Sequence, residues 1–307
     1  MQPTSLAAMA ARATRSTNRA ACSDDEDASR CLLLALSHDE LGVIFDGLAD
    51  PLQPVVAVAL SSTCLGLWTP LQAALEVLKE RHARAVALCR KMETSCAQLR
   101  DADNLIRINA GLTADVMATL SMVLQTNGLP KLQHLTLFAN HFGDAGVQAL
   151  CEGPGRGAAP SLLTLHLGQT DIGPAGAEAL AAAISKGAMP RLVRMLLNGN
   201  SIGNQGAAAL AAPLRKLPAL RDLDLVACKI GDEGVASLVA NLGKDDFKAL
   251  EDLALDINKI TDAGCATLAR VLRASPTALP LLTELALYGN PASVAAQKQP
   301  QAVLDGL

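Results

Sequence analysis

The sequence predicts an α/β solenoid, in which repeated strand–turn–helix units stack side by side. Leucine-rich stretches of the form L-x-x-L-x-L return along the chain, and their fourth positions fall at 135, 165, 195, 223, 253 and 285, with Met at 195. A spacing of about 28 to 32 residues is typical of solenoid proteins. Half of the residues are hydrophobic, yet only 2% are aromatic. A thin core of leucine and alanine explains this composition, because it has little room for rings.

The first 30 residues are expected to form a disordered tail. Residues 1–22 contain three arginines and no acidic residue, and an acidic run follows at 24–27. The first part has the composition of an organelle transit peptide. An unstructured tail is the favoured interpretation, and a targeting peptide is the alternative.

Residues 31–100 are expected to form a helical N-terminal domain. Thr69 and Pro70 predict the start of a helix, with Thr69 as the cap and Pro70 in the first position. This helix is expected to run for some 30 residues. Cys89 and Cys96 would then lie on one helix, roughly 10 Å apart at ~1.5 Å per residue. They would be too far apart to form a disulfide.

Apolar residues at helical spacing mark the region between residues 36 and 68. This region resembles the F-box, a three-helix module that docks onto the adaptor subunit of cullin-type ubiquitin ligases. The resemblance implies that an adaptor contacts these residues. The alternative is that the same helices only cap the open end of the solenoid, which every solenoid requires. The candidate adaptor-docking residues are Leu36, Leu41, Ile44, Phe45, Leu48 and Trp68.

The repeats occupy residues 101–307, in about six or seven copies. Residues 102–131 are a degenerate first copy, because Leu105 and Leu120 lie 30 residues before Leu135 and Leu150. Arg107 replaces the next expected leucine of that copy. Terminal repeats of solenoids are usually atypical, since one side faces water.

Each repeat consists of two segments with different periods. The leucine stretch alternates with period two and predicts a short strand. The segment after it, such as Ile172-Gly-Pro-Ala-Gly176-Ala-Glu-Ala-Leu180, has apolar residues at helical spacing. An Asp or Asn near the start of this segment is expected to cap the free N–H groups of the helix. One such unit cannot bury its own leucines, whereas stacked units can.

Most strands are followed by an asparagine, as in Leu132-Gln-His-Leu135-Thr-Leu137-Phe-Ala-Asn140. Over residues 132–290 the pattern resembles the leucine-rich repeat family, in its ribonuclease-inhibitor-like subtype. The resemblance implies a leucine-rich repeat solenoid with parallel strands on the concave face and helices on the convex face. Thr170 and Cys228 stand at the asparagine position, where members of the family often accept Thr or Cys.

The concave face is the predicted site of partner binding, because side chains flanking the inward leucines point out of the sheet. Its first half carries basic or neutral groups and its second half carries five carboxylates. Like charges on strands ~4.8 Å apart destabilise a sheet, so a basic segment of a partner is expected to dock there. The alternative is a chance run of polar residues. The candidate residues are His134, Phe138, His166, Arg194, Asp222, Asp224, Val226, Asp252, Asp256, Glu284 and Tyr288.

No pattern in the chain indicates catalysis. There is no phosphate-binding loop, no H-E-x-x-H motif and no G-x-S-x-G motif. No cofactor is expected. A metal site is disfavoured, because no loop has metal-binding spacing, although the carboxylates are the ligand type that Ca²⁺ and Mg²⁺ prefer. The net charge of −4 argues against nucleic acid as a partner.

The eight cysteines include no C-x-x-C pair, and there is no N-x-[ST] sequon. Both observations indicate a reducing compartment. The expected location is intracellular, in the cytoplasm or nucleus, with organelle import as the alternative. Apolar runs of about six residues, such as 55–60, are far below the ~18 needed to span a bilayer.

These observations predict a non-enzymatic protein-interaction module. One interpretation is the substrate-recognition subunit of a ubiquitin ligase, as the F-box resemblance implies. The other is a plain scaffold or inhibitor, in which the N-terminal helices only cap the solenoid. A GTPase activator is a weaker alternative, supported by the repeat type alone.

Overall fold

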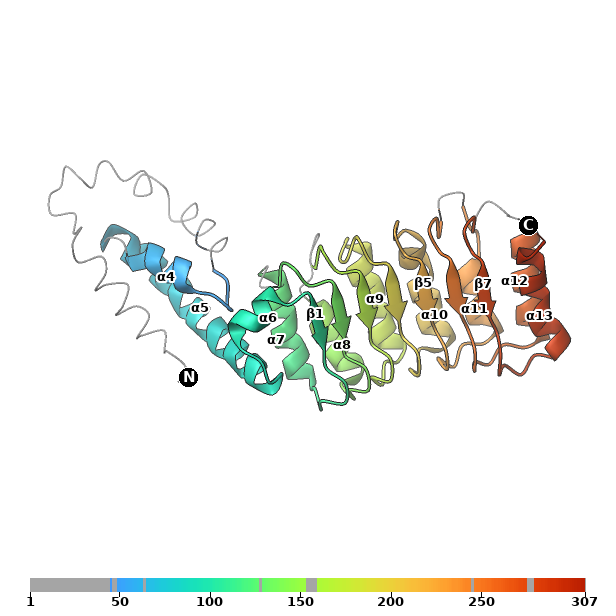
Figure 1. Cartoon of the computed structure of the whole chain (residues 1–307), viewed down its shortest axis with the longest axis horizontal. Coiled ribbons are helices and arrows are strands. Elements are labelled where there is room, and N and C mark those ends of the chain that lie inside the picture. The colour runs from blue at the N-terminus through green and yellow to red at the C-terminus, as the bar shows by residue number, and fades with distance from the viewer. Residues whose placement is uncertain are drawn as a thin grey trace. The chain divides into compact units, whose positions relative to one another are not determined.

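The computed structural model describes residues 45, 49–62, 65–126, 129–152, 159–243, 246–274 and 279–306. The chain divides into two compact units (Figure 1). One ends at Arg100 and includes Thr126, and the other consists of Asp101–Gln125 and the residues from Leu129 onwards. The predicted tail, residues 1–30, lies outside the described residues.

The N-terminal unit is helical in its described part. It contains α4 (Val55–Ser62), α5 (Leu65–Lys91) and most of α6 (Cys96–Asp101). The predicted start of the long helix was wrong, since α5 begins five residues before Pro70. Pro70 is the sixth residue of α5. A proline this close to the start has the backbone angle of a helix and removes only one hydrogen bond.

The predicted end of the long helix was also wrong, because α5 stops at Lys91. Glu93 adopts a left-handed backbone conformation with φ of 48°. Its N–H donates to the carbonyl of Arg90 at 3.1 Å, and the N–H of Thr94 donates to the carbonyl of Cys89 at 2.9 Å. This pair of bonds is the Schellman motif, which satisfies the last carbonyls of a helix and reverses the chain.

A capping box starts α6 directly after this turn. The Ser95 hydroxyl accepts a hydrogen bond from the Gln98 N–H at 3.2 Å, and the Ser95 N–H donates to Gln98 Oε1 at 3.1 Å. The turn brings Cys89 Sγ within 3.2 Å of Cys96 Sγ. The expectation that one helix holds these two sulfurs ~10 Å apart was therefore wrong. The Ser-x-x-Gln pattern at 95–98 is the sequence signal for the break.

The second unit contains a seven-stranded parallel sheet whose strands follow the order of the chain. Neighbouring strands pair without slippage, so that each position of one repeat lies beside the same position of the next, as Leu105 lies beside Leu135. This pairing confirms the degenerate first copy. The strands are β1 (Asn104–Ile106), β2 (His134–Thr136), β3 (Thr164–His166), β4 (Arg194–Leu196), β5 (Asp222–Asp224), β6 (Asp252–Ala254) and β7 (Glu284–Ala286).

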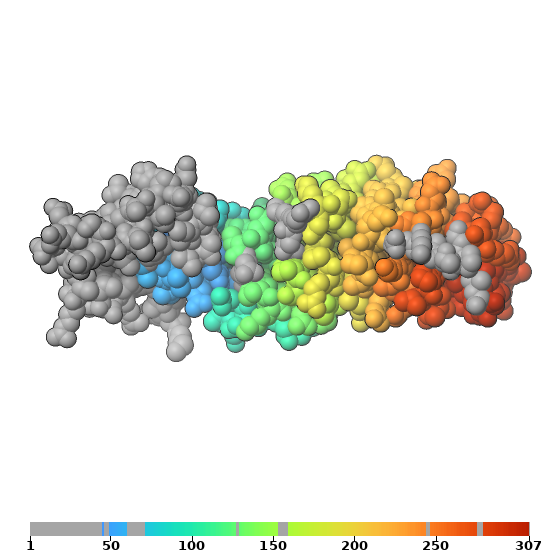
Figure 2. All heavy atoms as spheres, turned by 90° about the horizontal axis from the view of Figure 1, so that it is seen from above, coloured from blue at the N-terminus to red at the C-terminus, as the bar shows by residue number. Residues whose placement is uncertain are grey.

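A helix follows every strand and packs against the helices of neighbouring repeats. The space-filling view shows the repeats following one another in chain order (Figure 2). The first full repeat has a short helix that ends at Cys151, just before the Gly-Pro-Gly at 153–155. These helices are α7 (Ala114–Gln125), α8 (Gly143–Cys151), α9 (Pro174–Ser185), α10 (Gly203–Arg215), α11 (Asp232–Val239), α12 (Asp262–Ala274) and α13 (Val294–Leu304).

The core of this unit is the stack of leucines that the repeat pattern predicts. Leu135, Leu165 and Leu223 are each at most 1% exposed, and Met195 completes the same row. The residues on either side of these leucines are mostly half-buried or exposed. Helices therefore cover one face of the sheet and leave the other open, which confirms the predicted fold class.

Buried asparagines close the turn after most strands. Asn200 donates to the carbonyls of Leu167 and Leu197, and its Oδ1 accepts from the N–H groups of Thr170 and Ile172. These four bonds satisfy backbone groups that would otherwise be buried without partners. Thr170 and Cys228 keep part of this network. The hydroxyl of Thr170 donates to the carbonyl of Leu167 in its own repeat, and the thiol of Cys228 donates to the carbonyl of Leu197 in the preceding repeat.

The acidic and amide side chains near the helix starts cap the next repeat, not their own helix. Asp144 belongs to α8, yet its Oδ1 accepts from the N–H groups of Gly173 and Gly176, at the start of α9. The N-terminus of α8 has no side-chain cap. The expectation of a cap within each helix was therefore wrong, because parallel stacking places these side chains beside the helix start of the following unit.

None of the described helices is both long and apolar enough to cross a membrane.

Candidate partner-binding face

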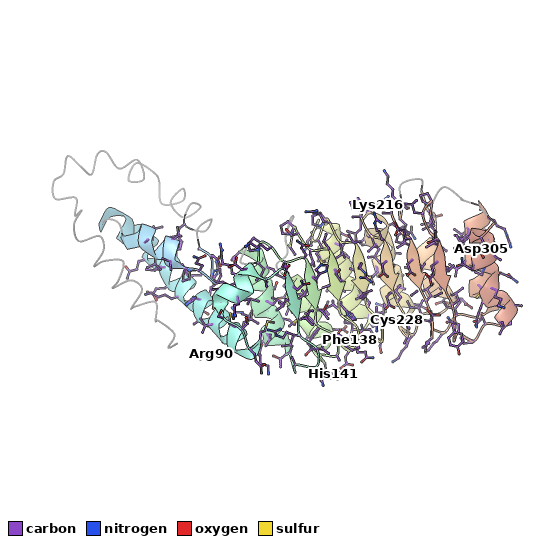
Figure 3. All side chains as sticks on the ribbon, in the orientation of Figure 1. Arg90, Phe138, His141, Lys216, Cys228 and Asp305 are labelled. Atoms are coloured by element: carbon purple, nitrogen blue, oxygen red, sulfur yellow. The ribbon has the colours of Figure 1, made fainter. Side chains whose placement is uncertain are left out.

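The open side of the sheet, here called the strand face, carries three rows of side chains, with one residue in each row from every repeat between β2 and β7. Figure 3 shows Phe138 and Cys228 at the edge where the strands end and Lys216 at the opposite edge. The rows are His134, Thr164, Arg194, Asp222, Asp252 and Glu284; Thr136, His166, Leu196, Asp224, Ala254 and Ala286; and Phe138, Gly168, Asn198, Val226, Asp256 and Tyr288.

The first half of the strand face contains an aromatic contact. The rings of Phe138 and His166 lie 5.0 Å apart between centroids and are tilted by 42°. Burial lowers the pKa of His166, although a hydrogen bond with Asn198 and the charge of Asp224 oppose this shift. Burial therefore disfavours the charged form of His166, and its ring provides an aromatic contact with Phe138.

Two residues of the strand face are less accessible than their positions predict. Thr164 is buried, and its hydroxyl lies 2.9 Å from Nδ1 of His134. Gly168 is also buried, because the side chains of Asn198 and His166 close over it. The predicted residues His134, Phe138 and His166 remain partly exposed on this half of the strand face.

An ion pair joins the two halves of the strand face. Arg194 on β4 lies beside Asp222 on β5, with Nε 3.0 Å from Oδ2. Asp222 is the first residue in the predicted row of like charges, and Arg194 therefore offsets the charge at that end of the row. The signal was present in the sequence, since Arg194 and Asp222 occupy the same position of consecutive repeats.

The remaining carboxylates crowd one another on β5 to β7 and just after β6. Asp252 lies between Asp222 and Glu284 in register. Burial raises the pKa of Asp252, and the charges of Glu284, Asp222, Asp224 and Asp256 raise it further. This crowding is the like-charge repulsion that the sequence predicts.

Asp224 lies in the same crowded region. Burial raises the pKa of Asp224, and the charges of Asp222 and Asp256 add to the shift. A hydrogen bond from the Val226 N–H at 2.9 Å and the nearby His166 partly offset this increase. The hydrogen bond from Val226 therefore stabilises the ionised carboxylate of Asp224 against the repulsion of its neighbours.

We define the acidic patch as Asp224, Asp252, Asp256 and Glu284. Within the described ranges, no ion pair involves any of these four residues. The carboxylate of Asp256 accepts the backbone N–H of Tyr288 at 2.6 Å, and the ring of Tyr288 is 80% exposed. The acidic patch thus combines uncompensated negative charge with a solvent-facing aromatic side chain.

No metal cluster is present in the part of the chain that the structure describes, since no three His, Cys, Asp or Glu side chains there could hold an ion together. The acidic patch is spread along the sheet rather than gathered around a point. Its arrangement suits a long partner better than a single cation.

The adaptor-docking residues are mostly outside the described residues. Leu36, Leu41, Ile44 and Leu48 fall there, and Trp68 lies within α5 but its side chain is not described. Phe45 is described, and its side chain is only 1% exposed. Adaptor docking therefore stays a prediction, and Phe45 as placed here contributes to packing.

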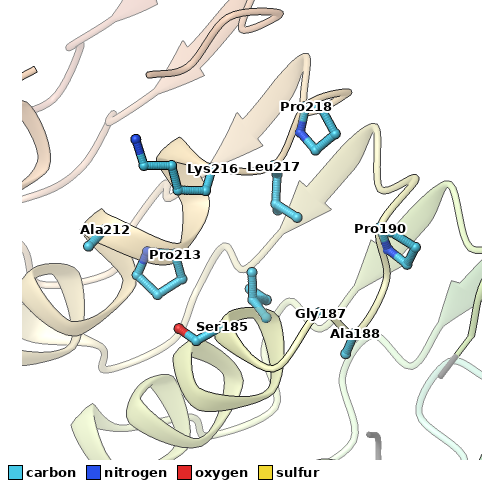
Figure 4. A pocket seen from close by; sticks show the side chains of 10 residues that line it. Ser185, Gly187, Ala188, Pro190, Ala212, Pro213, Lys216, Leu217 and Pro218 are labelled. Atoms are coloured by element: carbon cyan, nitrogen blue, oxygen red, sulfur yellow. The ribbon is translucent and has the colours of Figure 1, made fainter. Parts of the chain in front are cut away.

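An apolar hollow of about 440 Å³ lies away from the strand face. It is formed where α9 and α10 end and the chain turns back towards β4 and β5 (Figure 4). Ile184, Leu217, Pro190 and Pro218 contribute to its walls. The amine of Lys216 is held by Asp246 at 2.5 Å. Ser185 and Lys216 are the polar residues among those that line the hollow.

Comparison with known proteins identifies the repeats. A family profile described as "Leucine Rich repeat" matches residues 128–151, 158–181 and 216–239. The chain therefore carries leucine-rich repeats. The profile does not distinguish the ribonuclease-inhibitor-like subtype, which remains a prediction.

Among solved structures, the chain is similar to the leucine-rich repeat ectodomain of the Arabidopsis receptor kinase HAESA, in complex with an N-terminally extended IDA peptide hormone ligand. The two share 13% identity, over 56% of this chain and 32% of that chain, with a TM-score of 0.25. This chain thus spans about a third of the length of that structure. No curated protein matches the chain.

Proposed function

We propose that this chain is a non-enzymatic protein-interaction module, and that its acidic patch binds an extended, basic segment of a partner protein. The observation that carries this proposal is the set of five carboxylates on β5 to β7 and just after β6, of which only Asp222 forms an ion pair within the described residues. Leucine-rich repeats provide a long, regular surface rather than a cleft, which suits binding.

Electrostatic cost supports the proposal. Burial and mutual repulsion both raise the pKa of Asp252 and Asp224, so ionising these carboxyls costs more free energy in the free protein than in water. Lysine or arginine side chains placed among these carboxylates would relieve that repulsion. The basic side chains of the partner therefore strengthen binding and also stabilise the folded state of this chain.

The geometry supports an extended ligand. The carboxylates lie on neighbouring strands ~4.8 Å apart and on alternate residues along each strand, ~6.6 Å apart. A peptide that crosses β5, β6 and β7 would meet a carboxylate at each of these three repeats. Tyr288, at the end of the patch, offers a ring to an apolar or cationic side chain of the ligand.

Peptide titration tests this proposal. We expect the full-length protein to bind lysine-containing peptides more tightly as the number of lysines increases, with length held constant. Affinity should fall roughly tenfold or more between 0.05 and 0.5 M salt, because screening shortens the reach of exposed charges from ~14 to ~4 Å. Salt-independent affinity would exclude an electrostatic site.

A matched pair of variants locates the binding. Asp224→Asn, Asp252→Asn and Asp256→Asn together remove three charges from the acidic patch and keep the oxygens that accept N–H groups. Glu152→Gln, Glu178→Gln and Glu233→Gln together remove three charges from exposed positions outside the strand face. The first variant should lose binding and the second should keep it. Equal loss in both would place the site elsewhere or show that only net charge matters.

A ubiquitin-ligase subunit is the second candidate, and the apolar pattern at residues 36–68 supports it. Co-purification with the ligase adaptor tests this candidate. Changing Leu41 and Ile44 to Asp is a better probe than changing Phe45, whose burial makes unfolding the expected result. Adaptor recovered with the parent protein and lost with the folded variant would support the ligase role. Absence from both would leave the scaffold role.

A further inference from the structure

Two thiols of the N-terminal unit lie in contact. Cys89 is near the end of α5 and Cys96 is the first residue of α6, and their sulfurs are 3.2 Å apart. Both cysteines are reduced. A disulfide holds its sulfurs ~2.05 Å apart, so a movement of about 1 Å would allow the bond to form.

The turn between the helices holds these side chains together. On one side, the bonds from Glu93 to Arg90 and from Thr94 to Cys89 close α5. On the other side, the reciprocal bonds of Ser95 and Gln98 open α6. Because both helix ends are fixed by hydrogen bonds, the approach of the two sulfurs follows from the backbone.

The two thiols differ in environment. Cys89 is 3% exposed and donates its S–H to Cys96, which is half-buried. This hydrogen bond lowers the pKa of Cys96 to about 7, against the effects of burial and of the Asp50 charge. The same contact raises the pKa of Cys89, with burial as a further cause. Cys96 is therefore the more nucleophilic sulfur at neutral pH.

Asp50 links this cysteine pair to the rest of the unit. Its Oδ2 accepts a hydrogen bond from Arg100 Nε at 2.6 Å, and its Oδ1 accepts the N–H of Leu52 at 2.8 Å. The guanidinium of Arg100 offsets the Asp50 charge near Cys96. The thiolate therefore forms beside a paired acid rather than an isolated one.

We propose that Cys89 and Cys96 are a redox modification site, which forms a reversible disulfide by exchange with a low-molecular-weight disulfide such as oxidised glutathione. The Cys96 thiolate attacks one glutathione sulfur, the glutathione S–S bond breaks, and one glutathione thiolate leaves and takes up a proton. Cys89 then loses its proton and attacks Cys96 Sγ, which releases the second glutathione. The two protein thiols lose two electrons and two protons, and one oxidised glutathione becomes two reduced molecules.

The other described cysteines lack these features. Burial raises the pKa of Cys151 and of Cys228 to about 12, and it also raises the pKa of Cys265. All three are buried in the repeats. They are expected to stay reduced and provide internal controls.

Peptide mapping tests the proposal on the full-length protein. The protein is equilibrated at several ratios of oxidised to reduced glutathione, alkylated and digested with trypsin. Cleavage after Arg84, Arg90, Lys91 and Arg100 places the two cysteines in separate peptides, 85–90 and 92–100. We expect these peptides to be joined by a disulfide in a fraction that rises with the ratio and disappears on reduction.

Three variants make the result decisive. Cys96→Ser should abolish the linked peptides, and Cys265→Ser should leave them unchanged. Cys89→Ser should stop the reaction at a mixed disulfide between Cys96 and glutathione. The proposal is overturned if peptides 85–90 and 92–100 are never linked in the parent protein, or if either cysteine pairs with a different cysteine instead.

Discussion

At the scale of single residues, the strand face contains both an ion pair and a contact between like charges. Arg194 neutralises Asp222 across neighbouring strands. Asp252, the next residue in the same row, has carboxylates on both sides. One row of the sheet therefore contains both a stabilising pair and a repulsive one, and the effect of a substitution depends on which member is changed.

Removing the central charge should stabilise the fold at neutral pH. A carboxyl whose folded-state pKa is raised favours folding only when protonated, so stability increases as pH falls through that pKa, and the gain is complete below the unfolded value of ~3.9. Asp252→Asn is expected to be up to ~1 kcal/mol more stable than the parent at pH 7. This difference should disappear near pH 3. Urea unfolding at both pH values measures it.

Asp222→Asn is the matched control for this experiment. It removes a carboxylate from the same row but leaves Arg194 without its partner. We expect no stabilisation from Asp222→Asn at pH 7. If Asp252→Asn were no more stable than Asp222→Asn at pH 7, repulsion within the acidic patch would be negligible.

At the scale of secondary-structure elements, neighbouring repeats are joined by side chains that cap each other's helices. Asp232, in α11, accepts both the N–H and the hydroxyl of Thr261, just before α12. Gly264 lacks a Cβ and so leaves room for this carboxylate. Gly264 is therefore a close-packing residue, and the acid that needs the space comes from the previous repeat.

Removing one cap should therefore affect the following repeat. Asp232→Ala is expected to destabilise the protein by about 1 kcal/mol, because it leaves the N–H of Thr261, directly before α12, without its acceptor. Hydrogen exchange should become faster at the first turn of α12 and remain unchanged in α11. Glu233→Ala, an exposed neighbour in α11, should cost less than ~0.5 kcal/mol. Faster exchange in α11 alone would contradict capping between repeats.

At the scale of the whole unit that contains the sheet, the free energy of local unfolding is expected to vary from repeat to repeat. Each strand pairs only with its immediate neighbours, and β7 pairs with one strand while β4 pairs with two. In such a quasi-one-dimensional structure, the end repeat lacks one stabilising interface.

Native-state hydrogen exchange should show this gradient. Amides of β4 and β5 are expected to exchange most slowly, and those of β7 and α13 to exchange fastest, because local opening starts where an interface is missing. Mass spectrometry of peptides from each repeat measures the order. Uniform protection from β4 to β7 would indicate that this part of the sheet opens as one unit.

The repeat pattern by itself determined the strands, their parallel order and the buried leucines. One unit cannot bury its own leucines, so the period dictates stacking, and stacking dictates the register that places Asp222, Asp252 and Glu284 in one row. Most of the candidate site was therefore accessible from the sequence. The Arg194–Asp222 pair was missed, although the same register predicts it.

The tertiary structure decided the features that depend on how the chain turns and on what lies beside it. The capping of each helix by the previous repeat arises from packing between units. The contact of Cys89 with Cys96 depends on a single left-handed residue, Glu93, that ends one helix and allows another to begin. The repeat period determines which residues face inward, because apolar side chains must be buried. The backbone conformation of one residue, Glu93, determines that Cys89 and Cys96 meet.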